Sequence, residues 1–256
     1  MPTRFIGRRR GMKKNLKYLL FLLIFGIIGG YFTAVYQLEI LDEATKAVLL
    51  EQLPSLDLLI PITIFQTVGY ALFCGLVGKF FAEKIGLWHK PSINKDGVIT
   101  VVLVSIIGGL ALILPDVFIF ANFSDAIRES YNVKPTVEYF IASVTYGGVV
   151  EEVMLRLFFM SGIAFLIKFL SKKENVTEGQ LVVANIISAL LFAAGHLPAT
   201  AMTIGITPMI IFRCFLMNGG FGLVFGRLYR KRGIEYAMLA HAGVHIVSKL
   251  VWFIFI

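Results

Sequence analysis

Charged residues are scarce in this chain of 256 residues: only 16% are Asp, Glu, Lys or Arg, whereas 57% are hydrophobic. Soluble globular domains contain about 25% charged residues and about half apolar ones. The apolar residues here form several long blocks, and the mean hydropathy is +0.81. Blocks of this length predict membrane-spanning helices. The composition therefore excludes an ordinary soluble domain and predicts an all-α, polytopic integral membrane helical bundle.

Cysteine is also rare, because only Cys74 and Cys214 are present and both lie inside apolar blocks. This pattern excludes a disulfide framework. The formal net charge of +8 is by itself compatible with nucleic-acid binding. The basic residues, however, lie at the N-terminus and in alternate short loops, as the positive-inside rule describes for membrane proteins. We therefore expect membrane lipid around the protein and no nucleic-acid partner.

Seven apolar segments are predicted to cross the membrane, and the long fourth segment leaves a range of six to eight. The segments are Leu16–Tyr36, Leu58–Phe81, Gly97–Phe120, Thr136–Leu170, Leu181–His196, Pro208–Leu228 and Tyr236–Ile256. With residues 1–17 as a basic cytoplasmic N-terminus, every basic loop lies on the cytoplasmic side and the acidic segment 37–57 lies outside. Residues 18–256 are then expected to form one integral membrane domain, and we expect a multi-pass protein of a prokaryotic plasma membrane.

The fourth segment is too long for a simple span. At 1.5 Å per residue it extends over about 50 Å, against a hydrocarbon core of about 30 Å. It must tilt, protrude or break, and Gly147-Gly148 is the expected weak point. The same two glycines are expected to leave room for water and an extended substrate backbone. The segment Ala199–Ile206 is small and polar enough to predict a loop or a re-entrant turn.

Adjacent glutamates are the most unusual feature of the fourth segment, because a carboxylate in hydrocarbon is costly unless it is paired, protonated or hydrated. Glu151 and Glu152 point about 100° apart on a helix. Glu152 can pair with Arg156 four residues later, whereas Glu151 has no partner in its own helix. Glu151 therefore needs partners from other spans.

Three of the four histidines lie in predicted spans and could provide those partners. His196 ends the fifth span, while His241 and His245 are four residues apart and share one face of the last helix. Ionisable groups inside a membrane are functional-site candidates by default. We therefore expect Glu151 and these histidines to form one site.

The chemistry of these residue types allows more than one reading. No Ser, Thr or Cys lies within either histidine motif, so a serine or cysteine protease has little support. A carboxylate next to histidines can take a proton from water, and further histidines can bind an oxyanion. Alternatively, His196, His241 and His245 could bind Zn²⁺, whose bound water would attack the substrate. A third alternative is a non-catalytic immunity factor or scaffold.

Three motifs, taken in chain order, resemble the signatures of a known family. They are Glu151-Glu152-x-x-x-Arg156, Phe192-x-x-x-His196 and His241-x-x-x-His245. The resemblance is to the CPBP or Abi family, the type II CAAX prenyl endopeptidases that include the Ras-converting enzyme. It implies an intramembrane glutamic endopeptidase with a protease-like core at about residues 136–256, a water-accessible conical cavity and no cofactor.

The resemblance also implies roles for individual residues. Glu151 and His196 would activate the water, and His241 would help to form the oxyanion hole. Glu152 and Arg156 would support the geometry of the site, as would Phe192. The chain departs from the family at His245, where Asn or Asp is usual. An imidazole N–H can still donate to an oxyanion, but a third histidine also makes metal binding more plausible.

The resemblance implies a membrane-associated peptide or protein as the substrate, with or without a lipid attached. CAAX processing requires a prenylated C-terminal cysteine motif. Short loops and a basic cytoplasmic side are more typical of prokaryotic members, which favours peptide maturation or bacteriocin immunity over the processing of prenylated proteins.

Overall fold

The computed structural model describes residues 2–256, with side chains from Asn15 onward. The basic side chains of residues 1–14, which belong to the predicted cytoplasmic segment 1–17, lie outside the described residues. Within residues 2–256 the chain is helical and contains no β-strand. Both cysteines are free and buried.

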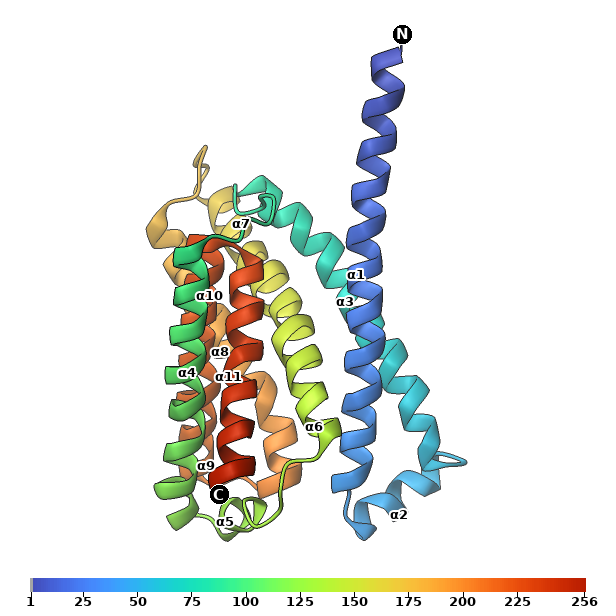
Figure 1. Ribbon diagram of the computed structural model, residues 1–256, viewed down its shortest axis with the longest axis vertical. Helices are drawn as coiled ribbons and strands as arrows, with labels where there is room; N and C mark the ends of the chain where they lie inside the picture. Colours follow the sequence, from blue (N-terminus) through green and yellow to red (C-terminus); the bar gives the residue numbers. More distant parts are fainter. Residues whose placement is uncertain (1) are drawn as a thin grey trace.

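The helices follow one another with short connections (Figure 1). They are α1 (Pro2–Ile40), α2 (Glu43–Gln52), α3 (Leu59–Lys84), α4 (Lys95–Phe118), α5 (Asp125–Ser130), α6 (Val137–Ala142), α7 (Ser161–Leu170), α8 (Glu178–Ile204), α9 (Pro208–Cys214), α10 (Gly220–Arg232) and α11 (Ile234–Phe255). Two 3₁₀ turns, η1 (Leu56–Leu58) and η2 (Phe120–Asn122), and three π-helical segments, η3 (Ser143–Glu151), η4 (Val153–Met160) and η5 (Phe215–Gly219), complete the described chain.

Seven helical runs in the described part are long and apolar enough to cross a membrane. They are Asn15–Ile40, Leu56–Lys84, Lys95–Asn122, Val137–Leu170, Glu178–Ile204, Pro208–Arg232 and Ile234–Phe255. Each overlaps one predicted span, so the all-α, multi-pass membrane architecture is confirmed.

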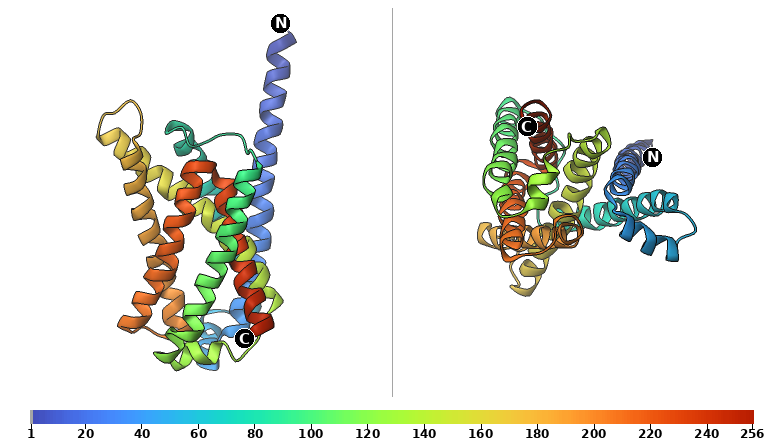
Figure 2. Two further views of the ribbon diagram at one scale, coloured as in Figure 1. Left: turned by 60° about the vertical axis from the view of Figure 1, so that its left-hand side comes forward. Right: turned by 90° about the horizontal axis from the view of Figure 1, so that it is seen from below.

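The spans form two parts that meet along the η3–η4 helix. α1 and α3 pack against each other and against η3 and η4, and they stand beside the other helices (Figure 1). On the other side α11 packs against α4 and η3, and α10 packs against α8 (Figure 2). The helix that contains the two glutamates is therefore enclosed from both sides.

The two ends of this bundle differ in net charge, although each also contains residues of the other sign. The connections at the end where α1 begins contain the basic residues Lys84, Lys90, Lys95, Lys172, Lys173, Arg230, Lys231 and Arg232 (Figure 1). The end with α2 and α5 contains the acidic residues Glu39, Asp42, Glu43, Glu51, Asp57, Asp125, Glu129 and Glu138. At the acidic end Asp42 caps α2, and the hydrogen bond from the backbone N–H of Thr45 lowers the pKa of Asp42. This separation fits the predicted cytoplasmic N-terminus, which stays a prediction.

The fourth span does not end at Gly147-Gly148, although its α-helix is interrupted there, as expected of a weak point. The chain instead widens into the π-helical segments η3 and η4 and continues to Leu170. A Cβ atom at Gly148 would lie only 2.8 Å from the Cβ of Ala242 on α11. Gly148 therefore allows two helices to approach closely and leaves no room for a substrate there. Gly147 does line the cavity described below.

The predicted loop at Ala199–Ile206 was wrong, because α8 continues through Pro198 to Ile204. Proline is tolerated in membrane helices, where other groups satisfy the backbone positions that it frees. The helix ends at Gly205, whose φ of 77° is a conformation that favours glycine.

Candidate active site

A cavity of about 640 Å³ extends from the helix that contains Glu151 and Glu152 toward the acidic end of the bundle. Its inner lining contains Glu151, His196, His241 and His245, contributed by η3, α8 and α11. Residues of α1, α2 and α9 line its outer part. The fold thus brings together the four predicted catalytic residues, although they come from three spans.

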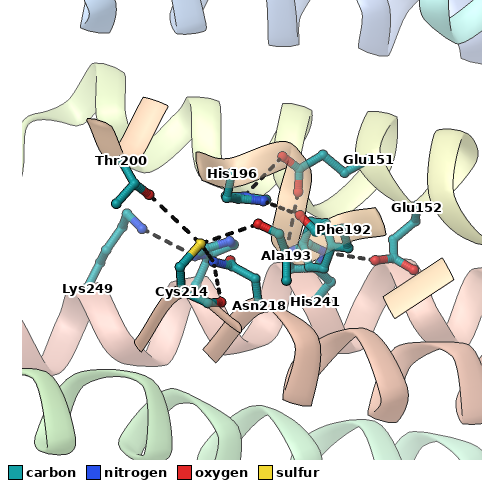
Figure 3. Close-up of polar contacts among 11 residues, drawn as sticks. Glu151, Glu152, Phe192, Ala193, His196, Thr200, Cys214, Asn218, His241 and Lys249 are labelled. Carbon is teal, nitrogen blue, oxygen red and sulfur yellow. Dashed lines mark hydrogen bonds and ion pairs between the residues drawn. The ribbon is translucent and has the colours of Figure 1, made fainter. Parts of the chain in front are cut away.

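Glu151 lies between two histidines from different helices (Figure 3). Its Oε1 is 3.9 Å from Nε2 of His196, and its Oε2 is 4.0 Å from Nε2 of His241. Its side chain is 17% exposed, which gives water access to it. Both distances exceed a direct hydrogen bond but suit a bridging water.

The tautomer of a neutral His196 ring follows from the contact that its Nδ1 makes. Nδ1 lies 2.9 Å from the carbonyl oxygen of Phe192, which can only accept a hydrogen bond. In a neutral imidazole the proton is then on Nδ1, and Nε2 presents a lone pair to Glu151. Two acceptors therefore face each other, and one water molecule can donate its two O–H groups to both. This arrangement orients and polarises a water in the way that general-base catalysis requires.

Glu152 contacts two residues in the buried part of the site. Its Oε2 lies 3.3 Å from Nε of Arg156, which confirms the predicted pair, and its Oε1 lies 2.8 Å from Nδ1 of His241. Glu152 is 0% exposed, Arg156 1% and His241 4%. The contact with His241 was not predicted, and it joins the first motif directly to the third.

Aromatic rings hold this network in place. The His241 ring stacks on Phe225, with ring centroids 4.5 Å apart, and Phe192 contacts the His196 ring edge-on at 4.6 Å. The guanidinium of Arg156 lies 4.9 Å from the centroid of Phe192. Phe192 thus touches both a histidine and the arginine, in agreement with the supporting position predicted for it.

His245 stacks on His241 with ring centroids 5.0 Å apart and is contacted by Lys249. Nζ of Lys249 lies 3.4 Å from Nδ1 of His245, and Lys249 as an ammonium would donate while Nδ1 accepts. The neutral His245 ring must then hold its proton on Nε2. A Cβ atom at Gly147 would lie 3.2 Å from this Nε2 and 3.7 Å from Nε2 of His241. Both nitrogens therefore converge beside Gly147, and His245 presents an N–H there.

The alternative of a metal held by His196, His241 and His245 stays a prediction. Within the described side chains, no group of three His, Cys, Asp or Glu residues has the arrangement of a metal site. Nδ1 of His241 contacts Glu152 and Nδ1 of His245 contacts Lys249, so a metal would have to bind the Nε2 atoms.

Sequence reasoning missed three polar residues that line the same cavity. Asp116 on α4 and Lys249 on α11 are each 4% exposed, and Tyr139 on α6 packs its ring under Lys249. Arg213, noted only as a polar residue of the sixth span, pairs with Asp116. The signal was present, because an ionisable residue inside a span is itself a functional-site candidate.

A comparison with protein families gives one match that agrees with this geometry. The family model described as "Type II CAAX prenyl endopeptidase Rce1-like" matches residues 133–247. This region belongs to the Rce1-like family. The Rce1-like region contains all seven predicted site residues, from Glu151 to His245, and confirms the expected resemblance. The match over residues 133–247 supports a membrane hydrolase of the CAAX-protease type in general. Neither the curated proteins nor the solved structures gave a match.

Proposed function

We propose that this protein is an intramembrane glutamic endopeptidase that hydrolyses a peptide bond of a membrane-associated peptide or protein without a metal cofactor. The observation that carries the proposal is the pair of facing acceptors, Glu151 Oε1 and His196 Nε2, at the inner end of a cavity. Glu152 is held by Arg156 and His241, whereas the carboxylate of Glu151 has two histidine Nε2 atoms at 3.9 and 4.0 Å and can act as a base on a water between them.

The reaction then follows from the positions of the groups. Water held by Glu151 and His196 attacks the peptide carbonyl carbon while Glu151 takes its proton. The carbonyl oxygen becomes an oxyanion beside Gly147, where Nε2–H of His245 donates to it. His241 can donate there as well only in its doubly protonated form, because its Nδ1–H is directed to Glu152. The C–N bond then breaks, the leaving amine takes the proton from Glu151, and the products are an amine and a carboxylic acid, which loses its remaining proton to solvent water.

The charge separation favours one side of the membrane for substrate entry. The cavity reaches toward the end that contains α2 and α5, which is the acidic end. By the positive-inside rule the opposite, basic end faces the cytoplasm. The cavity would then receive its substrate from the non-cytoplasmic side, which favours an exported or surface peptide over a cytoplasmic prenylated protein.

Comparing membrane-associated peptides between cells with the wild-type protein and cells with Glu151→Ala tests the function. We expect a defined set of peptides to appear only in the wild type and their longer precursors to accumulate in the variant. Identical peptide sets, with Glu151→Ala protein present at the wild-type level, would contradict an enzymatic function and favour the non-catalytic alternative.

A further inference from the structure

Lys249 lies one helical turn beyond His245 on α11 and lines the same cavity. His241, His245 and Lys249 follow one another at intervals of four residues, so they share one face of the helix. Nζ of Lys249 is 3.4 Å from Nδ1 of His245, at the long end of hydrogen-bond distances, and Lys249 is only 4% exposed. The row of histidines on α11 therefore continues into a buried lysine.

The surroundings of Lys249 leave its N–H groups available to His245. Among the described side chains, no carboxylate oxygen lies within 4.0 Å of Nζ of Lys249. Asp116, an acidic residue that lines the same cavity, accepts two hydrogen bonds from the guanidinium of Arg213 instead. Nζ of Lys249 lies 4.1 Å from the centroid of the Tyr139 ring, whose face attracts a cation. The ring of Tyr139 thus holds the ammonium beside His245.

The oxyanion role of His245 requires one of the two neutral tautomers of its ring. With the proton on Nε2, the ring presents an N–H beside Gly147; with the proton on Nδ1, it would present a lone pair there, which repels an oxyanion. The hydrogen bond that one ring nitrogen makes decides which nitrogen carries the proton. Among the described side chains, Lys249 is the only one that makes a hydrogen bond to Nδ1 of His245. Control of the tautomer therefore falls to Lys249.

We propose that Lys249 is a positioning residue that holds His245 in the tautomer with its proton on Nε2, and so keeps an N–H directed at the oxyanion. The inference rests on the proposed function and adds a residue to it. Donation from the ammonium to Nδ1 also polarises the ring, which strengthens Nε2–H as a donor. No proton changes place in this step, because Lys249 acts only through His245.

This role explains how the chain can depart from its family at His245. The asparagine that is usual there needs no partner to set a tautomer, because an amide always has N–H donors. A histidine does need one, and Lys249 provides it. Lys249 lies beyond the region 133–247 that matches the Rce1-like family. His245 and Lys249 together therefore replace a single asparagine.

The tautomer can be measured without any substrate. The full chain with ¹⁵N-labelled histidine, in lipid bilayers at neutral pH, contains four labelled rings, and the His245 signals are those that disappear in His245→Asn protein. ¹⁵N NMR distinguishes a ring nitrogen that carries a proton from one that does not. We expect the His245 proton on Nε2 in the wild type and on Nδ1 in a substantial share of Lys249→Met molecules. Lys249→Arg keeps a donor and should retain the wild-type tautomer.

A double-mutant cycle with His245→Asn separates this role from a purely structural one. Turnover would be measured on a synthetic peptide that spans a cleavage site found by comparing membrane-associated peptides. With His245 present, Lys249→Met should lower kcat by about tenfold or more with KM little changed, since the lost interaction is made in the transition state. In His245→Asn protein the same substitution should lower kcat by less than about threefold, because the amide donor does not depend on Lys249.

A matched control is Lys134→Met, which removes the same charge at an exposed residue. It should leave the tautomer and kcat as in the wild type. A loss of kcat as large as that from Lys249→Met would assign the effect to net charge and overturn the proposal. Lys249→Arg should recover part of the lost turnover.

The remaining outcomes distinguish this inference from the proposed function. A wild-type His245 proton on Nδ1, a tautomer unchanged in Lys249→Met protein, or equal losses of kcat in the two backgrounds would each overturn the role of Lys249, even in an active protease. An Nε2–H tautomer that depends on Lys249, in a protein that hydrolyses nothing, would instead contradict the proposed function and leave the control of His245 by Lys249 standing.

Discussion

Nδ1 of His241 lies 2.8 Å from Oε1 of Glu152, although the two residues are 89 positions apart in the chain. The same carboxylate pairs with Arg156, so a single buried network connects the helix of the two glutamates to α11. Glu152 is therefore more than a local counter-charge for Arg156, because it also orients a histidine whose other nitrogen faces Glu151.

This network predicts a strong stability effect. Glu152→Gln or Arg156→Met should each destabilise the protein by about 3–5 kcal/mol, because each leaves a buried charge without its partner. The double variant should lose less than the sum of the two single losses. Unfolding of the purified protein in detergent measures all three. Additive losses would contradict the coupling of Glu152 to Arg156.

The tautomer of His245 predicts the effect of replacing it. His245→Asn introduces the residue that is usual in the family and also has an N–H donor, so activity should remain within about tenfold of the wild type. His245→Leu removes the donor and should lower kcat by about 10²–10³. Turnover of the same peptide by both variants decides this. Equal activity of the Leu and Asn variants would exclude an oxyanion-binding role for His245.

The site was largely predictable from the sequence because its residues are conspicuous there. Ionisable residues are rare in apolar segments, so Glu151, His196 and His241 are conspicuous in the sequence. Glu152 and Arg156 are four residues apart, and this spacing predicts their ion pair. The contact of Glu152 with His241 could not be predicted, since it depends on how α11 packs against η3.

The seven spans were predictable for a similar reason, because long apolar segments have few alternatives to a membrane helix. Their local form was not. The π-helical widening at Gly147-Gly148 depends on the close approach of Ala242, and the continuation of α8 through Pro198 depends on its surroundings. Lys249 could have been noticed as an ionisable residue within a span, but only the packed structure shows that it lines the cavity.

Gly147 provides a test of where the oxyanion forms. A methyl group at this position would lie 3.2 Å from Nε2 of His245, in the space assigned to the oxyanion. Gly147→Ala should therefore reduce kcat strongly while the protein stays folded. Gly220→Ala is a matched control, because a Cβ atom there meets nothing within 4 Å. Equal turnover by the two variants would move the oxyanion site away from Gly147.

Membrane orientation can be measured by cysteine labelling. In a background with Cys74 and Cys214 replaced by alanine, Asp57→Cys marks the acidic end and Lys173→Cys marks the basic end. A membrane-impermeant maleimide added to intact cells should label Asp57→Cys only. Labelling of Lys173→Cys alone would reverse the orientation, and the cavity would then open toward the cytoplasm.

The most direct test of the central claim is hydrolysis in H₂¹⁸O by the purified protein. A mixture of membrane-associated peptides would be incubated with wild-type protein after exhaustive chelation, and new C-termini would be read by mass spectrometry. The account predicts new carboxylates with one ¹⁸O atom, and a rate that falls by about 10²–10⁴ in Glu151→Gln protein. Products formed at the wild-type rate by Glu151→Gln protein, or only when metal is restored, would contradict it.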